Sequence, residues 1–389
     1  MQVDEIDTIK YIFYTTDAPD NSPRQVYKQI FLYFFMSRII LTKIDIVRSF
    51  NQQMYMNEYI QQLEERNLLP LTKNNKKLKI IARLCGALFS DGSLYDGSKI
   101  NNYREISFAL GQKEDVEELE KDFKILNYKI HKKQTKGEMT INGRTFTIEG
   151  FRVRCASTSL FLLFKSLGVP VGKKTDKKYY IPNWIMNGPK DIKKEFLSAY
   201  IGGDGPRVTI RIQDRKKHGG PHNMIDINDI EFYKRTDLIK SGYKLAEQIS
   251  NLLEEFDINI NRVFHDKEEF PRKDGSKSVS IHIAISSKVE SALNLCKLGY
   301  SYCNQKREIT RDVIKFLKVI ADKRKAWKDL YNKSFELYNK GKTTKEVSET
   351  LNLSYETVFG WIKNNKNPTI NQHHILYNKW RLENGNSRD

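Results

Sequence analysis

The chain has 389 residues, enough for two or three domains, and 39% hydrophobic residues can supply packed cores. Its formal net charge of +18 favours a polyanionic partner, most simply a nucleic acid. The most apolar run, residues 30–41, contains Arg38 and is shorter than the about 20 residues that span a bilayer. The sequence therefore predicts no membrane segment.

The cysteines show no C-x-x-C spacing, which argues against a structural zinc site. We expect reduced thiols and an intracellular protein. The first residues are acidic and lack the basic start and apolar centre of a signal peptide. The four cysteines are Cys85, Cys155, Cys296 and Cys303.

Residues 1–76 are predicted to form a mostly helical N-terminal extension. Apolar residues recur at helical spacing between Ile39 and Leu63. Pro70 and the polar run 73–77 mark its boundary. The sequence assigns this segment no function.

Two similar sequence motifs occur in the chain. Residues 84–92 read LCGALFSDG and residues 197–205 read LSAYIGGDG. Each is an apolar helix with small residues that ends in Asp-Gly. A duplicated helix with an acid at each end can place Asp91 and Asp204 side by side on a pseudo-twofold axis.

Small residues four apart let two helix backbones approach closely, as Gly86 with Ser90 and Ala199 with Gly203 would allow. Helix ends also leave carbonyl groups unpaired, here those of Ser90 and Gly203. Two carboxylates, carbonyls and water suit Mg²⁺. Such ions support in-line hydrolysis of a phosphodiester. The alternative is that each Asp-Gly is only a turn after a buried helix.

The helices and strands predicted after one motif match those predicted after the other. This match predicts an α+β fold of two pseudo-symmetric αββαββα repeats. The first repeat, 77–190, has strands at 104–110, 144–148 and 151–155 and helices at 114–126 and 158–167. The second, 191–322, has strands at 207–213, 229–234 and 278–285 and helices at 238–256 and 288–298.

Several predicted strands alternate polar and apolar residues, so one face can pack on helices and the other can lie along a DNA groove. The alternative is an ordinary half-buried sheet with one solvent-exposed face. The candidate DNA contacts are Arg207, Thr209, Arg211, Gln213, Arg152, Arg154, Ser280 and His282.

The basic tail, 323–389, contains a compact unit that resembles a resolvase-type helix-turn-helix. Thr343 and Glu346 have capping-box spacing. Residues 355–364 would be the recognition helix, with Tyr355, Thr357 and Lys363 facing DNA. The alternative is a helical structural appendage. The predicted small core is Val347, Leu351, Leu353, Val358 and Trp361.

The paired helices and strands resemble the LAGLIDADG homing endonuclease family over residues 80–310, in its two-repeat, intein-type form. The resemblance implies saddle-shaped antiparallel sheets and makes Asp91 and Asp204 the metal-binding acids. Two departures from the family pattern are Ala199, where the family favours glycine, and Pro206 after the second Asp-Gly.

The resemblance also implies one catalytic lysine after each repeat. The stretch 172–182 looks like the Gly-Lys-Lys…Ile-Pro segment of intein-type members, and 298–307 is its counterpart. We assign Lys173 and Lys306, with Lys174 as a close competitor. The alternative is a basic loop that contacts DNA phosphates.

The resemblance implies a monomeric, site-specific double-stranded DNA endonuclease that uses Mg²⁺, with Mn²⁺ as a substitute. An RNA-binding maturase acting on intron RNA and a non-cleaving DNA-binding regulator are the alternatives. Both aspartates are present, which favours the enzyme. The terminal residues Met1 and Asp389 differ from the Cys or Ser start and His-Asn end of an intein, so we expect a free-standing protein.

Overall fold

A computed structural model describes residues 39–48, 55–97, 103–141, 144–215, 220–368 and 376–384. The chain divides into two compact units, Met1–Leu78 and Lys79–Asp389. The division lies next to the predicted boundary at residue 76. Among the described residues, no helix is both long and apolar enough to span a membrane.

The described part of the first unit is a small helical and extended segment. Ile39 and Ile40 lie in a strand rather than in the expected helix, as β-branched residues favour. Residues 1–38 and 49–54 of the predicted extension lie outside the described residues. The elements are β1 (Ile39–Leu41), which pairs antiparallel with β2 (Leu71–Thr72), α3 (Lys43–Arg48) and α4 (Met56–Glu65).

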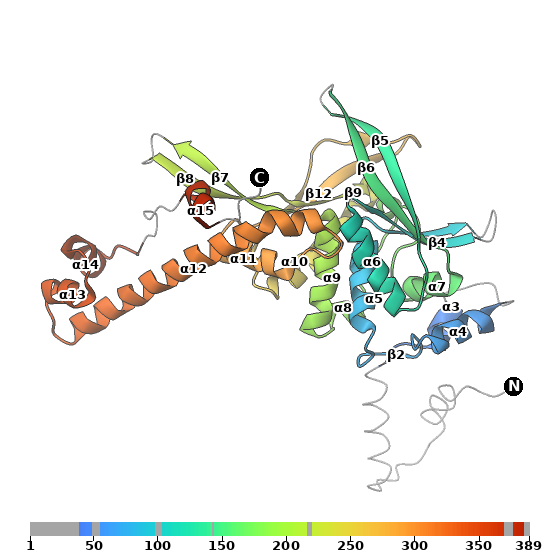
Figure 1. The fold of residues 1–389 in the computed structure, drawn as a ribbon, viewed down its shortest axis with the longest axis horizontal. Coiled ribbons are helices and arrows are strands. Elements are labelled where there is room, and N and C mark those ends of the chain that lie inside the picture. Colours follow the sequence, from blue (N-terminus) through green and yellow to red (C-terminus); the bar gives the residue numbers. More distant parts are fainter. Residues whose placement is uncertain are drawn as a thin grey trace, which may run out of the picture. The chain divides into compact units, whose positions relative to one another are not determined.

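The first half of the second unit has the predicted αββαββα order (Figure 1). Its four strands form one antiparallel sheet in the order β3-β4-β6-β5. The strands β3 and β5 were not predicted, and the run of β5, HKKQTKGEMTI, lacks apolar alternation. The two strands expected at 144–148 and 151–155 are a single strand, β6. The elements are α5 (Leu78–Phe89), β3 (Ser93–Gly97), β4 (Tyr103–Leu110), α6 (Lys113–Ile125), β5 (His131–Ile141), β6 (Arg144–Cys155) and α7 (Thr158–Ser166).

The second half departs from the predicted αββαββα order. The stretch expected to be a loop contains β8, which pairs with β7 as a separate two-stranded hairpin. A break at residues 228–229 then lets β9 join a different sheet, where it pairs with β12. The elements are α8 (Asn183–Met186), α9 (Lys190–Asp204), β7 (Val208–Arg215), β8 (Gly220–Ile227), β9 (Ile230–Arg235), α10 (Ile239–Glu254), β10 (Ile260–His265), β11 (Phe270–Pro271), β12 (Lys277–Ile285) and α11 (Val289–Leu298).

The cores of both halves are apolar faces of these elements packed together. In β12, alternate residues Val279, Ile281 and Ile283 are buried, as the period of a strand requires. They face α10, whose Leu245 and Ile249 are also buried. The cysteines Cys85, Cys155 and Cys296 are buried, and all four cysteines are free thiols.

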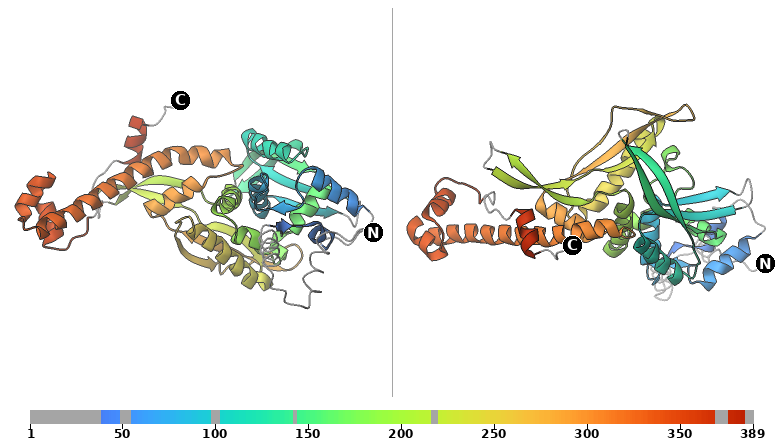
Figure 2. Two further views of the ribbon diagram at one scale, coloured as in Figure 1. Left: turned by 90° about the horizontal axis from the view of Figure 1, so that it is seen from below. Right: turned by 45° about the horizontal axis from the view of Figure 1, so that its top comes forward.

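The tail begins inside a continuous helix, α12 (Asn304–Asn339), so the predicted boundary at residue 323 falls within that helix. Figure 2 shows α12 from two further sides, with α13 (Thr344–Leu351) and α14 (Tyr355–Ile362) at its end. The predicted capping box is confirmed: Glu346 accepts from the Thr343 N–H at 2.7 Å, and Thr343 Oγ1 accepts from the Glu346 N–H at 3.3 Å. The last described helix is α15 (Tyr377–Asn384).

The predicted tail core is also confirmed. Val347 and Val358 are buried, with Leu351 and Leu353 packed against them. Trp361 is buried, and its ring meets the Trp327 ring of α12 edge-on, with the ring centres 5.3 Å apart. These contacts fix α13 and α14 as a compact helical pair.

Candidate active site

The helices α5 and α9 meet at their glycines, as the small-residue spacing predicts. A Cβ on Gly86 would lie 2.0 Å from the Phe196 carbonyl oxygen, so only glycine permits this approach. A Cβ on Gly203 would lie 2.4 Å from Ser90 Oγ and 2.9 Å from Asp91 Oδ2. The crossing therefore brings the carboxyl ends of both helices together.

The two acids meet at this crossing. Asp204 is the last residue of α9, and Asp91 follows α5. Burial, and secondly the charge of the Asp91 carboxylate, raise the pKa of Asp204 to about 7, while Lys174 and Lys306 partly oppose the rise. Two carboxylates held this close repel each other unless a proton or a cation lies between them.

A lysine caps the end of each of these helices. The Lys306 ammonium donates to the carbonyl oxygens of Gly203 at 2.8 Å and Gly205 at 2.7 Å, and also to those of Ile201 and Gly202. Its positive charge lies where the helix dipole is negative. Burial lowers its pKa, and the neighbouring aspartates act against that shift.

Lys174 does the same for the first helix. Its ammonium donates to the carbonyl oxygens of Gly92 at 3.0 Å, Phe89 at 3.2 Å and Leu88 at 3.3 Å. Burial lowers its pKa, opposed by the charges of Asp204 and Asp91. The structure thus brings Lys174 to the acid pair.

Lys173, the residue first assigned to this role, lies elsewhere. It precedes the short 3-10 helix η1 (Lys174–Asp176) and its side chain is exposed. Adjacent residues in an extended segment point in different directions, so only one of the two lysines can reach the helix end. The Gly-Lys-Lys pattern alone does not reveal which one.

Lys234 of β9 is a functional candidate that sequence reasoning missed. It is fully buried, and its ammonium donates to the carbonyl oxygens of Lys174 at 3.0 Å and Lys177 at 2.8 Å. It also lies 3.7 Å from the centre of the Tyr179 ring. Burial lowers its pKa to about 7. The sequence offered one sign that Lys234 is buried: it lies on the same face of the strand as the apolar residues Ile230 and Phe232.

A divalent ion fits the oxygen atoms present. The predicted ligands Asp91, Asp204 and the Ser90 and Gly203 carbonyls are hard donors of the kind that Mg²⁺ prefers. The Gly203 carbonyl already accepts from Lys306, which leaves it one lone pair. The described residues contain no group of three or more His, Cys, Asp or Glu side chains placed for a metal. An ion here would complete its shell with water or substrate oxygens.

The alternation predicted for residues 207–213 is confirmed up to Arg211 and is lost at Ile212 and Gln213, which are both half-buried. Val208 and Ile210 are buried, whereas Arg207 and Arg211 are exposed and Thr209 is half-buried. Arg211 also pairs with Asp226 of β8 at 2.8 Å. The remaining member of this set, Gln213, is half-buried.

The other candidate strands are less open to a ligand. Arg152 of β6 is exposed and Arg154 is half-buried, and each lies just under 4 Å from Glu105 of β4. Ser280 is fully buried and donates to Glu231 at 2.6 Å, which removes it from the DNA-facing set. His282 lies between Asp266 at 3.2 Å and Asp229 at 3.7 Å. β12 is the central strand of its sheet, and the His282 ring also stacks on the Phe264 ring of β10, with the ring centres 4.8 Å apart.

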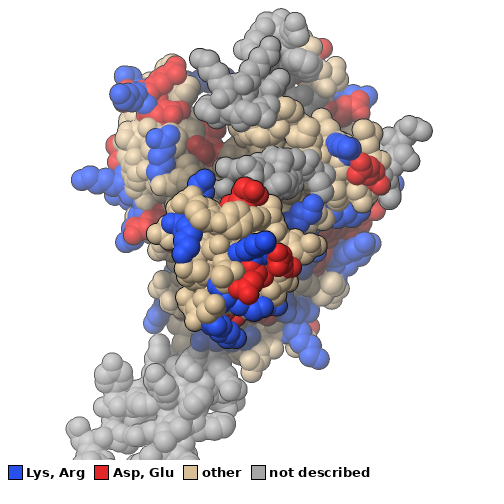
Figure 3. Space-filling view, turned by 90° about the vertical axis from the view of Figure 1, so that its left-hand side faces the viewer, with Lys and Arg blue, Asp and Glu red and all other residues tan. Residues whose placement is uncertain are grey.

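In the tail, Tyr355 is 45% exposed and Lys363 lies beside the Tyr338 ring, to whose hydroxyl it donates. Thr357 is half-buried, and its N–H is capped by Ser354. On the face drawn in Figure 3, Lys and Arg side chains lie interspersed with Asp and Glu.

No protein-family model matches the chain. Three proteins of Methanocaldococcus jannaschii are similar to it. The DNA-directed RNA polymerase subunit Rpo1N is 35% identical over 274 residues, covering 68% of this chain and 19% of that protein. The tRNA-splicing ligase RtcB is 29% identical, covering 75% and 29%. The replication factor C small subunit is 25% identical, covering 79% and 15%.

This chain spans less than a third of the length of each of these relatives. Among solved structures, the homing endonuclease I-DmoI is 12% identical with a TM-score of 0.33, covering 58% of this chain and 98% of that one. The homing endonuclease I-WcaI bound to its DNA recognition sequence is 16% identical with a TM-score of 0.33, covering 63% and 97%. Neither TM-score is high enough to establish a common fold.

Proposed function

We propose that this chain is a divalent-metal-dependent, site-specific DNA endonuclease of the LAGLIDADG homing type. The observation that carries the proposal is the meeting of Asp91 and Asp204 at two abutting helix ends, each capped by a half-buried lysine. In this proposal the saddle-shaped surface of the sheets binds double-stranded DNA, and the chain acts as a monomer.

The sequence relatives support a role separate from their own activities. A polymerase subunit, an RNA ligase and a replication factor have different functions, yet each alignment takes in two thirds or more of this chain. The matched stretches must therefore overlap. A segment that recurs inside proteins of unrelated function is best explained as an inserted element. A DNA endonuclease is an activity by which such an element can spread.

In the proposed reaction, Asp91 and Asp204 would hold a divalent metal, which when bound would supply Lewis-acid chemistry at the phosphodiester. Lys174 and Lys306 stabilise the charge that develops on the phosphate oxygens. The net charge of +18 favours binding of the DNA backbone. Both aspartates are present, which favours cleavage over the alternatives of a non-cleaving regulator or an intron-RNA maturase.

The test is cleavage of a supercoiled plasmid library that carries randomised inserts, with Mg²⁺ or Mn²⁺. We expect linearised plasmids that share one long, asymmetric site. Asp91→Asn and Asp204→Asn should abolish cleavage of that site yet retain DNA binding in a gel-shift assay. Wild-type protein that binds DNA but cuts no plasmid with either metal would overturn the proposal.

A further inference from the structure

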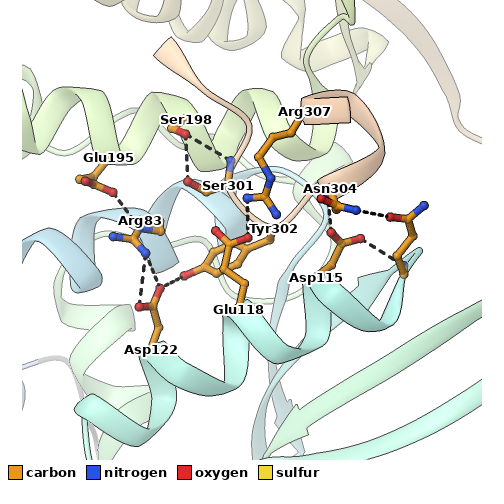
Figure 4. Close-up of polar contacts among 11 residues, drawn as sticks. Arg83, Asp115, Glu118, Asp122, Glu195, Ser198, Ser301, Tyr302, Asn304 and Arg307 are labelled. Atoms are coloured by element: carbon orange, nitrogen blue, oxygen red, sulfur yellow. Dashed lines mark hydrogen bonds and ion pairs between the residues drawn. The ribbon is translucent and has the colours of Figure 1, made fainter. Parts of the chain in front are cut away.

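Residues 302–307, which enter α12 and include Lys306 in its first turn, form a segment that is held by α6 of the first half (Figure 4). Asp115 of α6 accepts from the Asn304 N–H at 2.6 Å and from the Gln112 N–H at 3.1 Å. One carboxylate thus caps the first turns of two helices, α6 and α12. Asp115 is 2% exposed, so water cannot replace it easily.

Two further contacts fix the same segment. Tyr302 is buried and has a φ of +58°, a conformation that a bulky residue seldom adopts unless its surroundings hold it. Its hydroxyl donates to Asp122 of α6, which also pairs with Arg83 at 3.0 Å. Arg307 pairs with Glu118 at 2.5 Å. Figure 4 shows these acids lying along one side of α6 and facing the segment.

Lys174, the other lysine at the acid pair, lies in a backbone segment of the first half that is held by a residue of the second half. Lys234 belongs to β9 of the second half, and it donates to the carbonyl oxygens of Lys174 and Lys177 at the end of the first half. A buried ammonium without partners is costly, so Lys234 fixes this backbone strongly. Each lysine at the acid pair is therefore placed by a residue from the other half of the molecule.

We propose that the two lysines are cross-braced, with Asp115 positioning Lys306 and Lys234 positioning Lys174. The inference rests on the proposed function and adds that each lysine serves the cut in one of the two DNA strands. Asp115 and Lys234 are positioning residues, since each acts through a lysine. Loss of one brace should then slow the cut in one strand and spare the other.

The experiment follows nicking of supercoiled plasmid carrying the selected site, with the nicked strand identified by sequencing. Lys174→Met and Lys306→Met serve as references, and we expect them to slow opposite strands. Lys234→Met should then slow the same strand as Lys174→Met by about ten- to a hundredfold, as misplacement of a catalytic group does. Asp115→Asn should slow the same strand as Lys306→Met.

A second variant tests the Asp115 brace without changing the acid. Asn304→Pro removes the N–H that Asp115 accepts, at the first position of α12, where proline is tolerated. Asn304→Pro should slow nicking of the same DNA strand as Asp115→Asn does. The matched controls are Glu120→Gln on the same helix and Lys277→Met at the exposed start of β12, which should leave the ratio of the two nicking rates unchanged.

A merely structural role would slow both strands equally and lower the melting temperature. Equal slowing of both strands by Lys234→Met, Asp115→Asn and Asn304→Pro would overturn the cross-brace, as would selection of the same strand by all three. Failure of the wild type to cut at all would instead overturn the proposed function. The two failures are therefore distinguishable.

Discussion

Lys174 and Lys306 occupy corresponding places at the ends of two touching helices, with each ammonium bonded to three or more backbone carbonyls. The correspondence extends the duplication seen in the sequence to groups more than eighty residues downstream of each aspartate. It also replaces Lys173 by Lys174 as the partner of Lys306. Symmetric cations beside an acid pair suit a site that handles two phosphates.

The choice between the adjacent lysines can be tested directly. Lys174→Met should slow single-turnover cleavage by about ten- to a thousandfold, because it removes the charge that the proposed reaction uses to stabilise the phosphate oxygens. Lys173→Met should change the rate by less than about threefold, since the Lys173 side chain is exposed and lies away from the helix end. The reverse order of effects would reinstate Lys173.

The acid pair should give the protein a pH-dependent stability. The pKa of Asp204 is raised from 3.8 to about 7 by burial and secondly by Asp91. Folding therefore favours the protonated carboxyl. Its stabilising contribution is present below the unfolded pKa, near 4, and is lost as the pH rises through 7. Asp204→Asn cannot lose a proton, so it escapes this loss.

We expect the melting temperature of Asp204→Asn, relative to wild type, to increase by at least about 2 °C between about pH 5 and pH 8. Mg²⁺ should raise the wild-type melting temperature near pH 8 and leave that of the variant nearly unchanged, because binding stabilises the folded state. The control is Asp274→Asn, in a turn where a hydrogen bond from Ser276 lowers the pKa of Asp274. This variant should not reproduce the rise in melting temperature. A flat difference between Asp204→Asn and wild type would contradict the raised pKa.

The helix crossing should tolerate no side chain at Gly86. A Cβ there would lie 2.0 Å from the Phe196 carbonyl oxygen, which is backbone and cannot move alone. Gly86→Ala should destabilise the protein by about 1–3 kcal/mol or more, as overpacking does. The control is Gly137→Ala, because nothing lies within 4 Å of a Cβ at that position. Chemical denaturation compares the two, and equal stabilities would mean that the helices are further apart.

Sequence reasoning succeeded where the pattern is local. The two Asp-Gly motifs predicted that Asp91 and Asp204 lie at one helix crossing, and the Thr343–Glu346 spacing predicted a capping box. The structure contains both features. It failed where partners are distant in the chain. The hairpin strand β8 has a turn-like composition, and its strand state comes from pairing with β7.

Lys234 shows the same limit at the site. Nothing next to it in the chain indicates that its ammonium bonds to two carbonyls of a segment in the other half. The choice between Lys173 and Lys174 also depends on where the helix ends lie in space. Tertiary contacts, which no local pattern encodes, decide both cases.

A test of the tail must leave α12 and α15 intact. Cutting the chain at residue 323 would break α12, and a cut after Asn339 would remove α15, whose Tyr377 and Trp380 pack on Phe316. Point substitutions in α14 and at the residue directly after it avoid both effects.

We expect Tyr355→Ala combined with Lys363→Ala to weaken binding of the selected site and to leave the cleavage rate at saturating protein unchanged. Both side chains are exposed, Tyr355 at the first residue of α14 and Lys363 directly after its last residue, and the proposed chemistry lies in the Asp91–Asp204 centre. Loss of one phosphate contact should reduce the slope of log K against log salt by about 0.9. Footprinting should show lost protection at one flank only. The control Lys297→Ala, at the exposed end of α11, should retain slope and footprint. An unchanged footprint and salt slope in the double variant would mean that α13 and α14 are a structural appendage.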